Sequence, residues 1–327
     1  MRYAACILLF LVVCRHAAAA DVEIPLHDGS VVRLATVEEG AAILGTSDRF
    51  TSVLSPFDLQ SRLATDEPVT ENDLLRLASA QVLPWEDEHR ERIAAALAAI
   101  RPRLEGIGRM FPDVVPLIRT TGKEEGGAAY CRGGAIVLPD AVLGRSQQRL
   151  ERLLEHELFH ILSRHNPELR AKLYAIVGFR PCGEIELPAS LKDRKITNPD
   201  APTLDYYIEL ETDGKKVAAV PVLYASIESY DAARGGSFFR YMVFRLLVVH
   251  KEGDTWRAAL DDEGQPVLID PDDNDSYHEQ IGRNTRYIIH PEEVLADNFV
   301  HLVEGAENLA TPRIVEEMKA LLVPRER

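Results

Sequence analysis

The chain has 327 residues, of which 27% are charged, and its formal net charge at pH 7 is −15. This acidic excess argues against nucleic acid and anionic membrane surfaces as partners, because both repel negative charge. None of the four cysteines has a C-x-x-C partner, so the sequence gives no sign of a cysteine-based metal module.

The first twenty residues have the pattern of a removable export signal. Arg2 gives a positive start, residues 4–14 are apolar, and three alanines end the segment at Ala20. The apolar run is shorter than the roughly 20 residues needed to span a bilayer. We therefore expect a mature protein of residues 21–327 that is secreted or periplasmic and not stably inserted in a membrane. A lipoprotein and an uncleaved signal anchor are less favoured alternatives.

Cleavage at this point makes the protein more acidic. The removed segment contains Arg2 and Arg15 but no acid, so the formal charge changes from −15 to −17. The charge says little about the substrate, because the needs of solubility alone explain it.

Residues 21–110 are predicted to be mostly helical. A β-hairpin is expected first, because residues 23–26 and 31–34 flank a His-Asp-Gly-Ser turn. Thr36 and Thr70 each precede an acid by three residues, which is the capping-box pattern that begins a helix. A further helix is expected between Pro84 and Pro102. No linker follows, so these helices are expected to pack with the rest of the chain rather than form a propeptide.

Residues 111–327 mix strands and helices, which predicts an α+β fold. Strands are expected over residues 114–120 and 128–138, followed by a long helix over 147–164. A second helix begins after Asn166 with Pro167 at its first position. A β-rich insertion is expected at about 204–270, and C-terminal helices begin at Pro291 and Pro312.

The helix predicted over residues 147–164 contains one H-E-x-x-H sequence, formed by His156, Glu157 and His160. Positions i and i+4 lie one turn apart on a helix, so the two imidazoles can bind one zinc ion. Glu157 lies too far round the helix to bind that ion easily, but it is placed to take a proton from a zinc-activated water. The alternative is a surface helix with ordinary histidines, which is less favoured because two unpaired imidazoles in an apolar helix are costly.

A catalytic zinc needs a third protein ligand. Glu293 and Asp297 are four residues apart on the helix predicted after residue 290, so both point the same way. One carboxylate can bind the metal while the other accepts a hydrogen bond from a metal-binding imidazole. Acids in a first helical turn are also common for the helix dipole alone, so Glu292, Glu184 and His290 stay open as alternative third ligands.

Together the H-E-x-x-H motif and the later E-x-x-x-D motif resemble the gluzincins, the thermolysin-like group of zinc metallopeptidases. The resemblance implies a zincin-like catalytic domain over residues 111–327, with the β-rich insertion between its two metal-binding helices. It implies that His156, His160 and Glu293 bind zinc (Zn2+), with Glu157 as general base and Asp297 as the hydrogen-bond partner of His156.

The same resemblance implies a substrate-binding edge strand before the metal-binding helix. Ala128, Ala129 and Tyr130 lie at about the expected distance upstream, and an extended peptide can pair with such an edge. An ordinary edge strand is the equally weighted alternative.

Gluzincins usually stabilise the oxyanion with a tyrosine or histidine, and three residues of this chain are open for that role. Tyr287 is our nominal choice because it lies shortly before Glu293, with Tyr241 and His290 as alternatives. A half-buried core tyrosine is the competing interpretation of Tyr287.

Two cysteines, Cys131 and Cys182, remain after the predicted cleavage. In an oxidising compartment they can form a disulfide. Closing a loop of that length stabilises a fold by about 4 kcal/mol on the chain-entropy model. Two free thiols are the equally weighted alternative.

The sequence therefore predicts an exported zinc metallopeptidase that hydrolyses peptides or proteins. The alternative from another class is a non-catalytic zincin-like domain that binds a partner in the periplasm or outside the cell. A β-rich structural protein whose histidines bind no metal is a third possibility.

Overall fold

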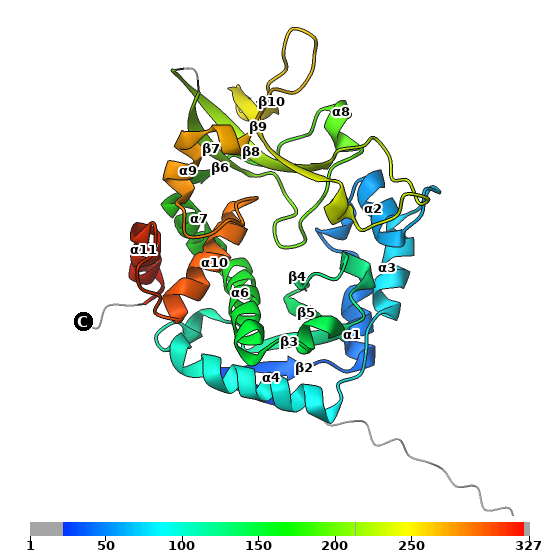
Figure 1. Ribbon diagram of the computed structural model, residues 1–327, viewed down its shortest axis with the longest axis vertical. Helices are drawn as coiled ribbons and strands as arrows, with labels where there is room; N and C mark the ends of the chain where they lie inside the picture. The colour runs from blue at the N-terminus through cyan, green and yellow to red at the C-terminus, as the bar shows by residue number, and fades with distance from the viewer. Residues whose placement is uncertain (1–21, 213, 324–327) are drawn as a thin grey trace, which may run out of the picture.

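The computed structural model describes residues 22–212 and 214–323, so the predicted signal peptide, residues 1–20, lies outside the described residues. The fold is α+β, as predicted, and its strands form two sheets. Figure 1 shows β7–β10 at the top of the view and β2–β5 near the bottom, with α6 and α10 beside each other. Nowhere in the two described ranges is a helix long and apolar enough to cross a membrane.

The first sheet has the order β1-β2-β3-β5-β4. Its strands are β1 (Val22–His27), β2 (Ser30–Leu34), β3 (Val114–Thr120), β4 (Tyr130–Arg132) and β5 (Ala135–Pro139). β2, β3 and β5 run parallel, whereas β4 is an antiparallel edge strand. The predicted N-terminal hairpin is confirmed as β1 and β2.

The single strand predicted over residues 128–138 is wrong, because the chain reverses in the middle of it. Gly133 and Gly134 have φ values of +57° and +77°, and glycine adopts this left-handed region without the steric cost of a side chain. The apolar residues on both sides made two short strands look like one. The reversal turns β4 into the edge that faces the helix with the H-E-x-x-H sequence.

Of the four N-terminal α-helices that the structure describes, the first, third and fourth pack on the first sheet and share its core, whereas the second packs through Phe57 against Leu223 and Ala225 of the second sheet. They are α1 (Val37–Leu44), α2 (Pro56–Leu63), α3 (Glu71–Ala80) and α4 (Asp87–Ile100). The predicted caps form at Thr36, which accepts from the Glu39 amide, and in the Thr70–Asp73 box. Ile93 and Ile100 of α4 belong to the same core cluster as Leu154. Residues 22–110 therefore share one sheet and one core with the rest of the chain.

The second sheet contains the predicted β-rich insertion. Its strands are β6 (Phe179–Pro181), β7 (Tyr206–Thr212), β8 (Lys215–Ala225), β9 (Met242–Glu252), β10 (Thr255–Ala258) and β11 (Leu268–Ile269). The order is β10-β9-β8-β7-β6, with β11 paired to β9. The strands all pair antiparallel, and burial alternates along β7 but is continuous over residues 219–223 of β8.

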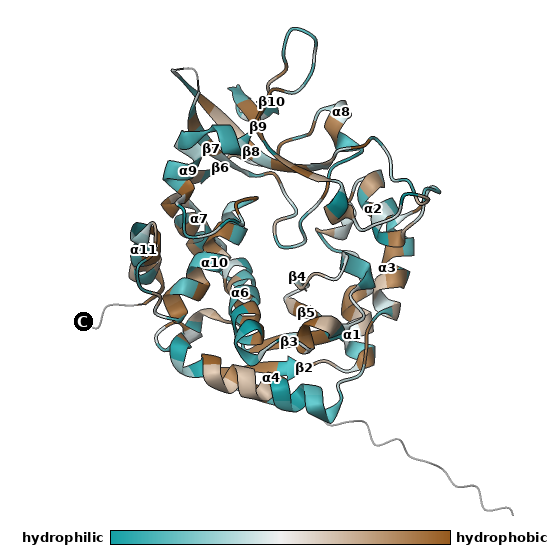
Figure 2. Cartoon of the chain, in the orientation of Figure 1, coloured by the Kyte–Doolittle hydropathy of each residue, from teal (hydrophilic) through white to brown (hydrophobic). Residues whose placement is uncertain are grey.

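Of the seven remaining α-helices in the described part of the chain, the first three connect the two sheets, the fourth lies between two strands of the second sheet, and the last three follow the last strand. They are α5 (Asp140–Leu143), α6 (Gln147–His165), α7 (Pro167–Ile176), α8 (Ala189–Lys192), α9 (Asp275–Ile281), α10 (Pro291–Val303) and α11 (Pro312–Leu322). The rings of Phe159 on α6 and Phe299 on α10 are fully buried, with centroids 5.6 Å apart. Figure 2 shows hydrophobic and hydrophilic residues sharing the same helices. The apolar faces hold α6 and α10 together and thereby fix their polar faces relative to each other.

Candidate metal centre

Helix α6 presents both histidines of the H-E-x-x-H motif on one side. Leu150, Leu154 and Leu158 are fully buried on its core side. The rings of His156 and His160 have centroids 4.8 Å apart, as expected for positions one turn apart. The predicted helix is therefore confirmed, and both histidines lie on one side of it.

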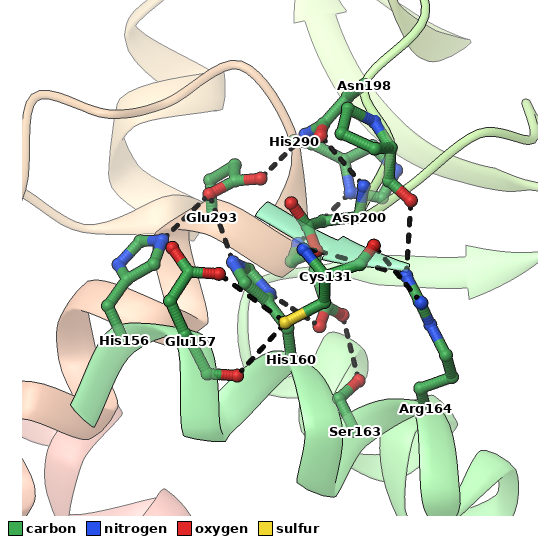
Figure 3. Close-up of polar contacts among 12 residues, drawn as sticks. Cys131, His156, Glu157, His160, Ser163, Arg164, Asn198, Asp200, His290 and Glu293 are labelled. Carbon is green, nitrogen blue, oxygen red and sulfur yellow. Dashed lines mark hydrogen bonds and ion pairs between the residues drawn. The ribbon is translucent and has the colours of Figure 1, made fainter. Parts of the chain in front are cut away.

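Helix α10 brings Glu293 against both imidazoles. Its Oε2 atom lies 3.1 Å from Nε2 of His156 and 3.5 Å from Nε2 of His160. The three ligand atoms lie within 4.8 Å of one another, and Figure 3 shows the Glu293 carboxylate between the two rings. Donor atoms of a tetrahedral zinc site with bonds of about 2 Å are roughly 3.3 Å apart. The residues present therefore fit a zinc ion.

The second nitrogen of each imidazole is held by a different carboxylate. Nδ1 of His156 lies 3.0 Å from Oδ1 of Asp297, the partner that the motif implied. Nδ1 of His160 lies 3.0 Å from Oε1 of Glu292. Each hydrogen bond keeps a proton on Nδ1 and leaves Nε2 to face Glu293, which is the tautomer that a metal ligand needs.

The role of Glu292 was missed by the sequence analysis, which treated it only as an alternative third ligand. Its other oxygen accepts hydrogen bonds from the hydroxyls of Ser163 and Tyr174, at 2.8 and 2.5 Å. A metal-binding histidine usually donates its second nitrogen to a carboxylate, and only His156 had been given such a partner. The unassigned partner of His160 was the signal that could have identified Glu292.

The charges of the site favour a bound cation. Burial opposes ionisation of Glu293, but the neighbouring charge on His160 and the hydrogen bonds from both imidazoles outweigh it and hold the Glu293 pKa well below its usual range. Burial likewise opposes protonation of His156, yet hydrogen bonds to Asp297 and Glu293 raise its pKa to about 9. The carboxylates thus attract positive charge to this point, whether it is carried by protons or by a divalent cation.

Glu157 points from the same helix into the cleft beside the three donor atoms (Figure 3), although it is not a member of the group that could hold the ion. Its side chain is buried, and its Oε2 lies 3.4 Å from the sulfur of Cys131. Burial, reinforced by the charge of Asp200, raises the pKa of the Glu157 carboxyl to about 7. A carboxylate with a pKa near neutrality can both accept and return a proton.

A loop between α8 and β7, residues 197–201, completes the site. Asn198 donates to Oε1 of Glu293 at 2.6 Å, and Oδ1 of Asp200 accepts the amide N–H of Cys131 at 3.0 Å. Figure 3 shows both residues facing α6 from the opposite side. The sequence analysis did not predict either residue, because an Asn-Pro-Asp sequence signals only a turn.

These residues line a cleft of about 800 Å³ between the first sheet, α6 and the loop. No family model, curated protein or solved structure matches this chain. The function is therefore inferred from the arrangement of the side chains in this cleft.

The predicted substrate strand borders the cleft, although only part of it is a strand. Ala128, Ala129 and Tyr130 line the cleft, and β4 begins at Tyr130. Within the described residues, the N–H and C=O groups of Ala129 make no hydrogen bond. The next outward-facing amide, that of Cys131, is already bonded to Asp200. The free edge is therefore one residue long.

Tyr287 also lines the cleft and stacks against His156, with ring centroids 6.2 Å apart and an interplanar angle of 23°. It is 41% exposed, so the competing interpretation of a core tyrosine does not apply. The other residues considered are engaged elsewhere. Tyr241 donates its hydroxyl to Gly235, and Glu184 forms an ion pair with Arg49.

His290, an alternative both as third ligand and as oxyanion residue, has a structural role. Its Nδ1 accepts the amide N–H of Glu292 and so caps the N-terminus of α10. Complete burial lowers its pKa to about 4, which keeps the ring neutral and able to accept this bond.

The disulfide alternative is not borne out, because Cys131 and Cys182 are both free. The sulfur of Cys131 lies against Glu157, whereas that of Cys182 contacts the carbonyl of Gly183. Burial raises the pKa of the Cys131 thiol well above its usual range. The two thiols point into different environments, so the alternative of two unpaired cysteines describes the structure.

Proposed function

We propose that this protein is a zinc-dependent metallopeptidase with a zincin-like catalytic domain over residues 111–327. The observation that carries the proposal is the convergence of three donors, from His156, His160 and Glu293, on one point in a cleft. The hydrogen bonds of Asp297 and Glu292 to the two imidazoles support it, because they fix the tautomer required for metal binding.

Zinc at this point would polarise a carbonyl and make a water molecule more acidic. Glu157 is the group that takes the proton from the attacking water, because it borders the cleft next to the donors. The same carboxyl then delivers the proton to the leaving amine, a double role that its pKa near neutrality permits.

Two further groups orient the substrate in the proposed mechanism. The free N–H and C=O of Ala129 pair with one residue of an extended peptide at the edge of β4. The exposed ring of Tyr287, stacked on His156, places its hydroxyl in the cleft, where it can donate to the developing oxyanion. The partly buried amide of Asn198 holds Glu293 in position from the other side.

Export of the mature protein, residues 21–327, to the periplasm or the outside of the cell is part of the proposal. It rests on the signal pattern of residues 1–20. The proposed substrates are peptides or proteins, and the acidic charge of the chain still argues against nucleic acid.

The deciding experiment is metal analysis of the purified mature protein beside two variants. We expect about one zinc per chain in the wild type and in His250→Ala, whose histidine is exposed on β9 outside the site. His156→Ala is expected to lose the metal. Absence of zinc from the wild type, even after zinc is supplied, would remove the basis for the proposal.

A second variant separates the peptidase from a non-catalytic zincin-like binding domain. Glu157→Gln keeps the shape of the side chain but cannot take up the proton, so we expect it to retain zinc and lose hydrolysis of a peptide library. Turnover retained in Glu157→Gln would refute the proposed base. Stoichiometric zinc with no turnover in any form of the protein would favour the binding domain.

A further inference from the structure

Three arginines line the cleft along the N-terminal half of the metal-binding helix. Arg149 and Arg152 lie on α6, and Arg145 lies just before its first residue. Arg149, Arg152 and His156 are separated by three and four residues, which places them on one side of α6, and Arg145 lies in the bend that precedes the helix. The stripe therefore leads along the cleft toward the proposed metal site.

Two of these arginines have no side-chain partner among the residues that the structure describes. Arg152 forms an ion pair with Glu304 of α10. The guanidinium groups of Arg145 and Arg149 form no hydrogen bond or ion pair within residues 22–212 and 214–323. This is notable in a chain with 52 acidic and 37 basic side chains, where a cation meets an acid easily.

The position of Arg149 is also unfavourable for the helix itself. The first turn of α6 contains no acid, and Ser146 makes no capping hydrogen bond with its side chain. A cation at this end opposes the helix dipole, which favours negative charge there. Helix stability therefore does not explain an arginine at this position. Arg149 is exposed where it lines the cleft, so its guanidinium is accessible to an anion bound there.

The cleft is divided by polarity. The walls near the metal site carry the carboxylates of Glu157, Asp200 and Glu293. Apolar side chains from the second sheet and its loop line another part, among them Phe239, which is 44% exposed. The uncompensated cations lie only at the Arg145–Arg149 end, so an anionic group of a bound peptide is attracted to that end alone.

We propose that the cleft selects peptides carrying a carboxylate, bound by Arg145 and Arg149, two or three residues from the cleaved bond. The inference deepens the proposed peptidase function and rests on it. Arg149 lies seven residues before His156, or about 10 Å along a helix that rises 1.5 Å per residue. An extended peptide covers that distance in about three residues. Arginine pairs with carboxylates through two parallel hydrogen bonds, which suits this recognition.

In the first test, the zinc-loaded protein cleaves a random octapeptide mixture, and mass spectrometry identifies the products. Glu or Asp is expected two or three residues to one side of the cleaved bond. The best-cleaved sequence is then made in four forms, with Glu or Gln at that position and a free or amidated C-terminus. We expect kcat/KM to be roughly ten-fold higher for the form whose carboxylate reaches the arginines than for the matched form in which an amide replaces that carboxylate. The Glu/Gln pair reports a side-chain carboxylate, and the acid/amide pair reports a chain terminus.

The variant Arg145→Ala/Arg149→Ala is expected to abolish this ten-fold preference, so that its kcat/KM values for the Glu and Gln forms become equal. Arg101→Ala serves as the matched control, because Arg101 is exposed and lies outside the cleft. Cleavage by the wild type with no preference for a carboxylate would overturn the inference. So would a preference that survives in the double variant.

A binding measurement separates this inference from the peptidase proposal. Fluorescein-labelled octapeptide mixtures with a fixed Glu or a fixed Gln are titrated against Glu157→Gln protein, with and without the two arginine substitutions. In one outcome, the wild type cleaves nothing while Glu157→Gln protein still binds the Glu mixture more tightly than the Gln mixture, and does so only when both arginines are present. That result would support the carboxylate site and refute the peptidase. No cleavage and no preference in binding would overturn both.

Discussion

Glu292 and His160 form a buried pair, with Oε1 of the carboxylate 3.0 Å from Nδ1 of the imidazole. The adjacent residue, Glu293, faces Nε2 of the same ring at 3.5 Å. Two consecutive carboxylates of α10 thus contact opposite sides of one imidazole. The first holds the ring in position, and the second is the proposed ligand.

The Glu292→Gln variant tests this division of roles. Removing the negative charge weakens the hold on His160, so we expect zinc affinity to fall about 10–100-fold while one zinc per chain still binds at saturation. Competition with a coloured zinc chelator measures the affinity. Glu316→Gln on α11, an exposed position, is the control and should match the wild type. An unchanged affinity in Glu292→Gln would show that its charge does not support the ligand.

The neutral cap of α10 predicts a pH effect on the stability of the metal-free protein. The pKa of His290 is lowered to about 4 in the folded state, against 6.5 for the unfolded chain. The neutral His290 ring therefore contributes fully to the free energy of unfolding above pH 6.5. This contribution is lost as the pH falls toward 4, by up to about 3 kcal/mol. Urea unfolding between pH 7.5 and 4, with a chelator present, measures this loss.

The matched variant for that measurement is His290→Asn, because asparagine caps helices but does not titrate. The fold raises the pKa values of His156 and His160, so their effect on stability has the opposite dependence on pH. The measurement therefore compares the free energies of unfolding of the wild type and His290→Asn at each pH. We expect the stability advantage of the wild type to shrink as the pH falls. A difference that stays constant from pH 7.5 to 4 would exclude His290 as the titrating group.

The Phe159–Phe299 contact predicts that the metal site depends on packing between α6 and α10. Both rings are fully buried, so Phe299→Ala should lower the free energy of unfolding by about 3–5 kcal/mol. Thermal unfolding measures this loss, and Leu321→Ala, at a 37% exposed position, should change it by much less. We also expect weaker zinc binding in Phe299→Ala, because the helix that carries Glu293 is less firmly held.

The free cysteines predict that reducing agents do not affect stability. The melting temperature of the mature protein should be the same with and without dithiothreitol, because Cys131 and Cys182, the cysteines of the described residues, form no disulfide that could constrain the unfolded chain. In the folded protein, a thiol reagent should react far faster with Cys182 than with the buried Cys131. A drop in melting temperature on reduction, absent from Cys182→Ser, would instead indicate a disulfide.

Local features of this protein were predictable because they depend on neighbours in the sequence. The H-E-x-x-H spacing places His156 and His160 on one side of a helix whatever the rest of the chain does. The same holds for Glu293 and Asp297 on α10, and for the cap-and-proline signals that begin α7, α10 and α11. Apolar runs and an Asp-Gly hairpin signal likewise predicted β7, β8 and β9 of the second sheet.

The turn at Gly133 and Gly134 shows where local reasoning failed. The residues on either side suit a strand equally well as one segment or as two, and the choice depends on pairing with β3. Only the folded sheet separates β4 from β5 and places β4 at the edge, where its outward groups meet the cleft.

Contacts between distant residues were decided by the tertiary structure alone. His156 and Glu293 are 137 residues apart, and their encounter depends on the packing of α6 against α10. The loop that carries Asn198 and Asp200 reaches the site because β6 and β7 anchor it on the other side of the cleft. Sequence periodicity records which face of an element is apolar, but not which other element covers it, because that depends on the packing of the whole chain.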